Sequence, residues 1–321
     1  MKLTLLKTLA AALLLGGASL SCACAQDFPN RRLSLVVGFA AGSGADVLAR
    51  YYASGLSTEV GQPVIVENRP GANGAIATQA VLQSKPDGYT LLFAPSASMS
   101  GGKFLYANHA FDSQKDFVIA APLLDNGFVL AVSANSSVHS VAELTALLRS
   151  KPTARYGTAN STGIAAAQVY KTLAGVSATQ VAYRTTGDAV PDLADGTLDF
   201  MFLDGVFALS QLKTGKVRLL ATVGSRIAGA PDVPTMEEAG IKGYGFSVWW
   251  MIAVPTGTPK DAVDRLNVAF TRISKMPETK AFLATAAASP LTGTPDATAV
   301  KLAKDIETWR ELARTGGIKP Q

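Results

Sequence analysis

Short runs of β-branched residues alternate along this chain with stretches of amphipathic helical spacing, and this alternation limits the fold more than any other feature. Repeats of strand, helix and strand predict an α/β protein with mainly parallel sheets and helices on both faces. One series starts at residue 33, and a second series with a similar plan starts near Gly127. We therefore expect two similar lobes, with chain crossings near residues 126 and 228 and a ligand between the lobes. The expected strands are residues 33–39, 62–67, 89–94, 128–132, 154–157, 179–183, 198–202 and 217–223, and the expected helices are residues 44–58, 75–84, 141–150, 162–174, 259–275 and 296–315.

The length of the chain suits two lobes. A chain of 321 residues is too long for one ordinary core and divides well into units of about 150 residues. Its 48% hydrophobic, 17% charged and 7% aromatic residues exclude a disordered, collagenous or coiled-coil protein. The net charge of +5 is spread thinly, in clusters no larger than pairs such as Arg31–Arg32. We therefore expect no nucleic-acid partner and a weak field that favours an anionic small ligand.

The N-terminus predicts an exported protein. Lys2 and Lys7 precede an apolar stretch at residues 9–20, and small residues follow up to Ala25. These are the three regions of a cleavable signal peptide, so we expect residues 1–25 to be removed and the mature protein to be periplasmic. The apolar stretch is too short to remain as a membrane anchor. Cleavage after Ala25 would lower the net charge from +5 to +3.

Cleavage would also remove both cysteines, Cys22 and Cys24, so the mature chain could form no disulfide, thiolate metal site or cysteine nucleophile. A lipoprotein would need an aliphatic residue three positions before the modified cysteine, where Ser19 and Ser21 stand instead. The two histidines lack the H-E-x-x-H spacing of a zinc site. We expect no metal and no cofactor. An exported enzyme is the weaker alternative, because no nucleophile–base pair is present.

The loop after the first expected strand has a sequence typical of an anion-binding turn. Glycines between Gly38 and Gly44 let the backbone approach a ligand, and the helix that follows presents free N–H groups. The spacing matches neither a P-loop, nor a dinucleotide-binding fingerprint, nor a nucleophile elbow. The alternative is a tight turn with no ligand, since such turns are common in α/β folds. The candidate binding residues in this loop are Phe39, Ala40, Ala41, Gly42, Ser43 and Asp46.

A second loop repeats this plan in the other lobe, at residues 156–163. Its hydroxyl and amide side chains are donors for a carboxylate, and the loop has no acidic residue that would repel one. The alternative is a run that only caps the next helix, through Ser161 or Thr162. Two such turns, one opening the central helix of each lobe, favour a shared ligand more than either turn alone. The candidates in this loop are Thr158, Asn160, Ser161, Thr162 and Gly163.

Further candidates follow other expected strands. Ser96 and Ser98 either supply hydroxyls to the cleft or form a plain turn. Arg184 either holds a second carboxylate or faces solvent, and we favour solvent. Asp204 either accepts a ligand hydroxyl or caps the next helix, and we slightly favour the cap. The pair Trp249–Trp250 is more typical of core or hinge packing than of a stacking platform.

Several strings of this sequence, taken in order, resemble a known family. They are QPVIVENRPGANG at residues 62–74, KPDGYTLL at 85–92, DVPTMEEAG at 232–240 and VPTGTP at 254–259. From about residue 29 to 318 the chain resembles the extracytoplasmic solute receptors of the tripartite tricarboxylate transporter system, also called Bug-type receptors. It departs from the family pattern in the first loop, where Gly38 and Ala41 replace prolines and Ser43 replaces a glycine.

The resemblance implies a two-lobed type II periplasmic-binding fold that closes over a carboxylated ligand. Residues 26–126 with 228–321 would form one lobe, and residues 127–227 the other. The loops at 39–46 and 156–163 would hold a carboxylate, and the ligand would be a di- or tricarboxylate or an aromatic acid. The implied partner is an inner-membrane permease, and we expect a monomer. The alternative output is a signal presented to a sensor protein.

Overall fold

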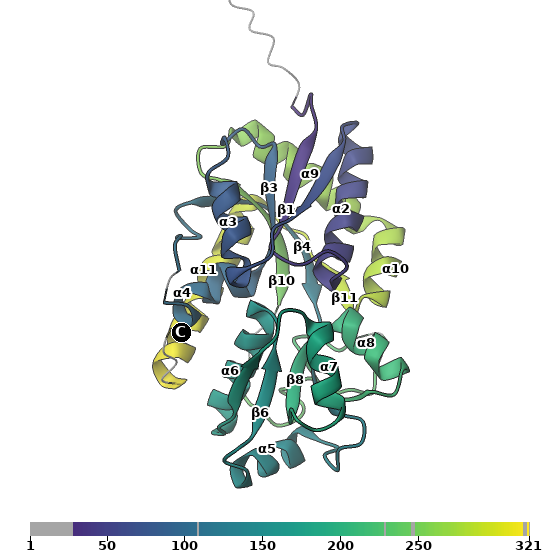
Figure 1. Cartoon of the computed structure of the whole chain (residues 1–321). Helices are drawn as coiled ribbons and strands as arrows, with labels where there is room; N and C mark the ends of the chain where they lie inside the picture. The colour runs from purple at the N-terminus through teal and green to yellow at the C-terminus, as the bar shows by residue number, and fades with distance from the viewer. Residues whose placement is uncertain (1–27, 108, 228, 245–247, 317–319, 321) are drawn as a thin grey trace, which may run out of the picture.

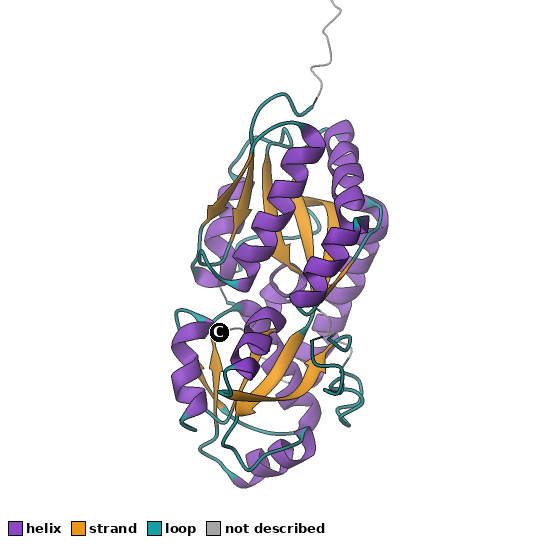
Figure 2. Ribbon diagram, turned by 90° about the vertical axis from the view of Figure 1, so that its right-hand side faces the viewer, coloured by secondary structure: helices purple, strands orange, loops and turns teal. Residues whose placement is uncertain are grey.

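The computed structural model describes residues 28–107, 109–227, 229–244, 248–316 and 320. The signal peptide expected at residues 1–25 lies outside these residues. Two β-sheets, each with helices on both faces, follow one another along the long axis of the molecule (Figures 1 and 2). We call the unit around the sheet with β1 the first lobe and the unit around the sheet with β5 the second lobe.

The first lobe contains a six-stranded sheet of order β11-β4-β10-β3-β1-β2. Helices α2, α9 and α10 cover one face of this sheet, and α3 and α11 cover the other. Two short helical turns, η1 (Ala72–Gly74) and η2 (Ala97–Gly101), also belong to it. The other elements are β1 (Leu33–Val37), α2 (Gly44–Val60), β2 (Val64–Asn68), α3 (Ala75–Leu82), β3 (Thr90–Pro95), α4 (Gly102–Leu105), β4 (Phe117–Asn126), β10 (Trp249–Pro255), α9 (Lys260–Lys275), α10 (Pro277–Thr285), β11 (Ala288–Pro290) and α11 (Pro295–Gly316).

The second lobe contains a five-stranded sheet of order β7-β6-β8-β5-β9. Helices α5 and α6 pack on one face, and α7 and α8 pack on the other. Its elements are β5 (Phe128–Ser133), α5 (Val141–Ser150), β6 (Arg155–Thr158), α6 (Ser161–Ala174), β7 (Thr179–Ala182), α7 (Thr186–Ala194), β8 (Phe200–Asp204), α8 (Gly205–Lys213) and β9 (Val217–Val223).

Both sheets are more mixed than the alternation of strands and helices predicts. β1 is parallel to β2 and β3, and β6 is parallel to β7 and β8, as expected for strands joined by crossover helices. β10 is antiparallel to β3 and β4, and β5 is antiparallel to β8 and β9. The physical reason is that β4 leads straight into the other lobe and β10 returns from it, so neither needs a crossover within its own sheet.

The chain crossings and the corner between α10 and β11 lie together. Gly127 alone separates β4 from β5, and its N–H donates to the carbonyl oxygen of Ala287 (2.8 Å). A Cβ on Gly127 would lie 2.4 Å from Cγ2 of Ile227, so only glycine fits.

Farther along, α11 packs on α6 of the second lobe, where Trp309 joins the same apolar cluster as Tyr170 (Figure 1).

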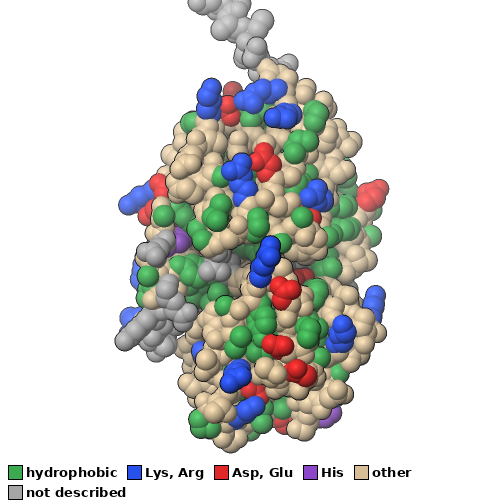
Figure 3. All heavy atoms as spheres, in the orientation of Figure 1, with side chains coloured by type: hydrophobic (Ala, Val, Ile, Leu, Met, Phe, Trp, Pro, Cys, Tyr) green, Lys and Arg blue, Asp and Glu red, His purple; other side chains and the backbone are tan. Residues whose placement is uncertain are grey.

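None of the helices in the described part of the chain combines the length and the hydropathy that a membrane span requires. Lysine, arginine, aspartate and glutamate side chains are scattered over the face in Figure 3, without a large region of one sign.

Candidate ligand-binding site

A cavity of about 470 Å³ lies where four helices begin. α2, α6, α7 and α8 each follow the carboxyl end of a strand, and residues at the start of all four helices line the cavity. Free N–H groups and the positive end of the helix dipole at such positions favour an anion. The residues that line the cavity are Gly38, Phe39, Ala40, Ser43, Gly44, Ala45, Pro70, Gly71, Ala72, Gly74, Phe128, Ala159, Asn160, Thr162, Tyr183, Arg184, Thr185, Thr186, Asp204 and Trp250.

The structure brings part of the expected site to this cavity. The expected residues that line it come from both lobes and are Phe39, Ala40, Ser43, Asn160, Thr162, Arg184 and Asp204. The expected residues outside the cavity lining are Ala41, Gly42, Asp46, Ser96, Ser98, Thr158 and Gly163, and the side chain of Ser161 lies outside the described part of the structure. Several of these residues stabilise the backbone near the cavity, as their hydrogen bonds show.

In the first loop, Asp46 holds the backbone in shape. Its carboxylate accepts hydrogen bonds from the Gly42 N–H (2.9 Å), the Arg50 Nε (2.9 Å) and the Asn68 amide (2.9 Å). Gly42 has φ of 80°, a left-handed conformation that favours glycine. Ser43 caps α2, since its hydroxyl accepts from the Asp46 N–H. Burial raises the pKa of Asp46, but these hydrogen bonds and the Arg50 charge more than offset it, so the pKa lies below its usual value.

In the second loop, one hydroxyl is left without a partner. Asn160 caps α6 by accepting from the Gly163 N–H (2.8 Å), and the Thr158 hydroxyl accepts from the Gln180 amide (3.0 Å). Thr162 is 1% exposed, and its Oγ1 has no hydrogen-bond partner among the described residues. Asn160 therefore takes the capping role that the sequence offered to Ser161 or Thr162.

Ser96 and Ser98 stabilise the end of β3. The Ser96 hydroxyl accepts from the Trp249 N–H (3.3 Å), and the Ser98 hydroxyl donates to the Pro95 carbonyl oxygen (3.0 Å). Neither serine lines the cavity, and the chain after β3 is helical, through η2 and then α4, so the plain turn that the sequence offered as the alternative is also wrong.

Arg184 and Asp204 place a guanidinium group and a carboxyl group at the cavity wall. Arg184 precedes the capping box of α7, which Thr185 and Asp188 form, and it makes no ion pair in the part of the chain that the structure describes. Asp204 caps α8 by accepting from the Phe207 N–H (3.0 Å), so the favoured alternative for this residue is what the structure shows. Burial raises the pKa of Asp204.

The sequence interpretation missed Trp250 as part of the cavity wall. The side chain is 2% exposed, as core packing predicts, yet it also lines the cavity. The loop that contains Pro70–Gly74 also lines the cavity, and the sequence interpretation missed it. Its glycines and proline indicate a loop, which is where binding residues are often found. The aromatic wall residues Phe128 and Tyr183 carried no such signal.

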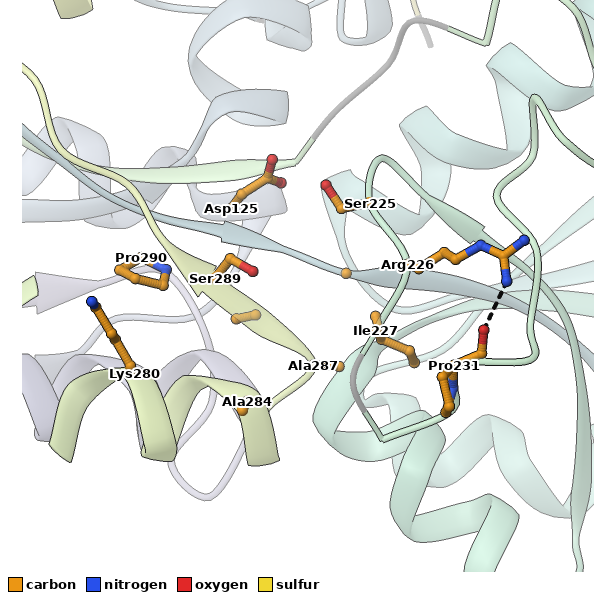
Figure 4. Close-up of a pocket in the computed structure, with 12 residues that line it drawn as sticks. Asp125, Ser225, Arg226, Ile227, Pro231, Lys280, Ala284, Ala287, Ser289 and Pro290 are labelled. Carbon is orange, nitrogen blue, oxygen red and sulfur yellow. Dashed lines mark hydrogen bonds between the residues drawn. The ribbon is translucent and has the colours of Figure 1, made fainter. Parts of the chain in front are cut away.

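A second cavity of about 390 Å³ lies at the crossings, away from the four helix starts. It is formed by the corner between α10 and β11, the end of β4 and the segment after β9 (Figure 4). The guanidinium of Arg226, which lines this cavity, forms an ion pair with the Glu238 carboxylate (3.1 Å) and donates to the Pro231 carbonyl oxygen (2.8 Å). Asp125 also lines this cavity, and burial raises its pKa to about 6.

Two lobes joined by crossing segments, with a cavity at the helix starts between them, define a solute-binding receptor. The family model described as "Tripartite tricarboxylate transporter family receptor" matches residues 48–317, and the chain belongs to this family. The chain is 33% identical to a UPF0065 protein of Bordetella bronchiseptica, over 98% of this chain and 95% of that protein. It is 31% identical to Protein BugT of Bordetella pertussis, over 92% of each chain.

Solved structures give the same result. A structure titled as R. palustris Rpa4515 with adipate is 30% identical and has a TM-score of 0.85, covering 92% of this chain and all of that one (100%). Periplasmic binding protein BugD is 27% identical with a TM-score of 0.83, over 92% and 100% of the two chains. MatC from Rhodopseudomonas palustris with bound malate is 28% identical with a TM-score of 0.82, over 89% and 99%.

Proposed function

We propose that this receptor captures a small organic carboxylate in the periplasm and delivers it to the inner-membrane permease of a tripartite transporter. The observation that carries the proposal is the cavity at the starts of α2, α6, α7 and α8, where the buried hydroxyl of Thr162 has no hydrogen-bond partner among the residues that the structure describes. Four aligned helix starts attract an anion, and the unpartnered hydroxyl can donate to it. The adipate and malate in two similar structures support a carboxylate as that anion.

In this proposal residues 26–126 with 228–321 move as one body and residues 127–227 as another, with one correction at the boundary. Residues 229–244 move with the second lobe, because the Met236 N–H donates to the Thr222 carbonyl oxygen (2.8 Å) and the Tyr244 hydroxyl donates to the Ala166 carbonyl oxygen (2.9 Å). The loops at 39–46 and 156–163 close on the carboxylate, and Arg184 and Asp204 meet the rest of the ligand. The bound ligand shifts the population toward the closed form, and the permease recognises the closed form. The signal peptide at residues 1–25 directs export. The ligand leaves chemically unchanged, and the receptor acts as a monomer.

The proposal is tested by thermal denaturation of the purified mature protein with a panel of mono-, di- and tricarboxylates and aromatic acids. A true ligand at about 100 times its Kd adds about 2.7 kcal/mol to the free energy of unfolding and raises Tm. The primary amide of each acid is the matched control and should give no shift, because it lacks the charge. The absence of a shift with every acid would contradict the proposal.

Transport is tested in cells. Uptake of the radiolabelled ligand should fall when either the receptor or the permease is deleted. Undiminished uptake without the permease would instead assign the receptor a sensing role. Recovery of the ligand unaltered after release from the protein would exclude turnover.

A further inference from the structure

Two buried donors at the wall of the ligand cavity have no hydrogen-bond partner among the described residues. They are Oγ1 of Thr162, on α6 of the second lobe, and Nε1 of Trp250, on β10 of the first lobe. Their residues are 1% and 2% exposed, and both residues line the cavity. A buried donor without a partner costs about 1–3 kcal/mol of stability, so each one needs an explanation. The Tyr106 hydroxyl is a third such group among the described residues, but Tyr106 does not line the ligand cavity.

Trp250 is held firmly and cannot turn to find an acceptor elsewhere. Its ring stacks on Phe93 with centroids 4.7 Å apart and meets Phe39 at 5.3 Å. Its backbone pairs with Pro95 on one side and Leu124 on the other, in the middle of the sheet. The position of the indole N–H is therefore fixed by the core of the first lobe.

The indole N–H of the neighbouring residue, Trp249, does have a hydrogen-bond partner. Nε1 of Trp249 donates to the carboxylate of Asp305 at 2.5 Å, and the Trp249 side chain is buried away from the cavity lining. Of these two adjacent indole N–H groups, that of Trp249 has a partner and that of Trp250, the residue that lines the cavity, has none among the described residues.

An indole N–H can only donate, so its partner must be an acceptor oxygen and not an ammonium group. Folding has already removed this donor from water. A ligand oxygen that reaches it therefore forms a hydrogen bond without a further desolvation cost on the protein side.

Resting on the proposed function, we propose that Trp250 is a specificity-determining residue that donates to a second acceptor oxygen of the bound acid. The first carboxylate lies at the start of α6, near Thr162, and the second oxygen meets the indole of the first lobe. The receptor then prefers acids with a carbonyl or second carboxylate oxygen over plain alkyl acids of the same length. One such ligand touches both lobes and links them in the closed form.

The test compares wild type with Trp250→Phe, which keeps an aromatic ring against Phe39 and Phe93 and removes the N–H together with part of the indole ring system, a loss of volume that all three kinds of probe acid share. The probes are matched sets of straight-chain acids of about four to eight carbons, each set an alkanoate, an oxoalkanoate and an alkanedioate, a size range suited to such a cavity. Isothermal titration should show about tenfold weaker binding of the oxygen-bearing acids by the variant and no change for the alkanoates. The oxoalkanoates and alkanedioates distinguish a carbonyl from a second carboxylate.

The matched control is Trp249→Phe, which should lower Tm through loss of the Asp305 hydrogen bond and leave the preference between probes unchanged. In ¹⁵N-labelled wild type, the indole resonance of Trp250 should move downfield with an oxygen-bearing acid and stay in place with an alkanoate. Equal loss for all three acids, or no loss for any, would overturn the role of Trp250 while the carboxylate receptor stands. If no acid of any set binds wild type, the proposed function fails as well.

Discussion

The hydroxyl of Thr162 provides the sharpest prediction for a single residue. Thr162→Val keeps the shape of the side chain and removes a buried polar atom that has no partner among the described residues. The free energy of unfolding should stay the same or rise, because an unsatisfied group is lost. Carboxylate affinity should fall about tenfold, because a hydrogen bond to a charged group is lost. Thermal denaturation and isothermal titration measure the two effects separately.

Thr145→Val is the matched control for that change. Thr145 is also a buried helical threonine, but its hydroxyl donates to the Val141 carbonyl oxygen (2.8 Å) and contacts the Tyr170 hydroxyl (2.9 Å). This variant should lose stability and keep its affinity. A loss of stability in Thr162→Val with intact affinity would show that the Thr162 hydroxyl is structural.

Sequence alone placed hydroxyl and amide residues at the start of α6, because such residues after a strand mark a helix N-terminus. It did not distinguish those that serve the fold from those left for a ligand. The Thr158 hydroxyl accepts a hydrogen bond from Gln180 on the next strand, and the Asn160 side chain accepts one from its own helix. Whether the Trp250 indole N–H has a hydrogen-bond partner also depends on residues that are distant in the sequence, so the local sequence carries no signal for it.

At the scale of elements, α2 and the loop before it depend on Asp46. Asp46→Asn places an amide N–H₂ group against donors and should lower the free energy of unfolding by roughly 1–3 kcal/mol at neutral pH. Because the pKa of Asp46 is lowered in the folded state, its stabilising contribution is present above the ordinary value of 3.8 and is lost as pH falls below it. Denaturation of wild type and variant as a function of pH should therefore converge in acid.

Arg50→Gln is the control for the ion pair, since the Arg50 side chain is 54% exposed and such pairs contribute about 0–1 kcal/mol. Ligand affinity should fall in Asp46→Asn, because the loop at 39–44 loosens, and stay near wild type in Arg50→Gln. Equal stability of wild type and Asp46→Asn at neutral pH would contradict this role.

The elements differ in how well their sequence predicts them. β9 and α5 have the expected bounds, and β1, β2, β3 and β6 differ by a few residues, because hydrophobic periodicity and capping residues are local signals. The expectation omitted β4, whose ten residues include Pro122, and α8, which follows β8 directly. Antiparallel pairing of β10 between β3 and β4 joins segments more than a hundred residues apart, and periodicity carries no information about such partners.

At the scale of the whole molecule, the crossings contain a carboxylate that opposes folding at neutral pH. Asp125 lies two residues before Gly127, near Lys301 and Asp305 of α11, and accepts no hydrogen bond from a described side chain. Burial raises its pKa from 3.8 to about 6 in spite of Lys301. The folded state therefore binds more protons, and its stability falls as pH rises from 3.8 to about 6.

Asp125→Asn should remove this dependence. The variant should have a higher Tm than wild type near pH 7, and this difference should disappear below about pH 3, where Asp125 is protonated in both the folded and the unfolded state. Denaturation scans of both proteins across this range provide the measurement. A variant less stable than wild type near neutral pH would show that the charged form makes a favourable contact at the crossings.

The approach of the two lobes can be tested at Gly44, the first residue of α2. A Cβ at Gly44 would lie 2.6 Å from Oδ1 of Asp204 in the second lobe, and Asp204 is fixed as the cap of α8. Gly44→Ala places that Cβ between the lobes. Alanine suits the start of a helix, so any fall in Tm without ligand reports the contact with Asp204 and not a loss of helix propensity. Carboxylate affinity should fall tenfold or more (about 1.4 kcal/mol per tenfold), and the ligand-induced decrease in radius of gyration measured by X-ray scattering should shrink.

Gly187→Ala is the matched control, because its Cβ would meet nothing closer than the Thr185 hydroxyl at 3.7 Å. Full affinity and full compaction in Gly44→Ala would mean that the contact between Gly44 and Asp204 is absent from the liganded form.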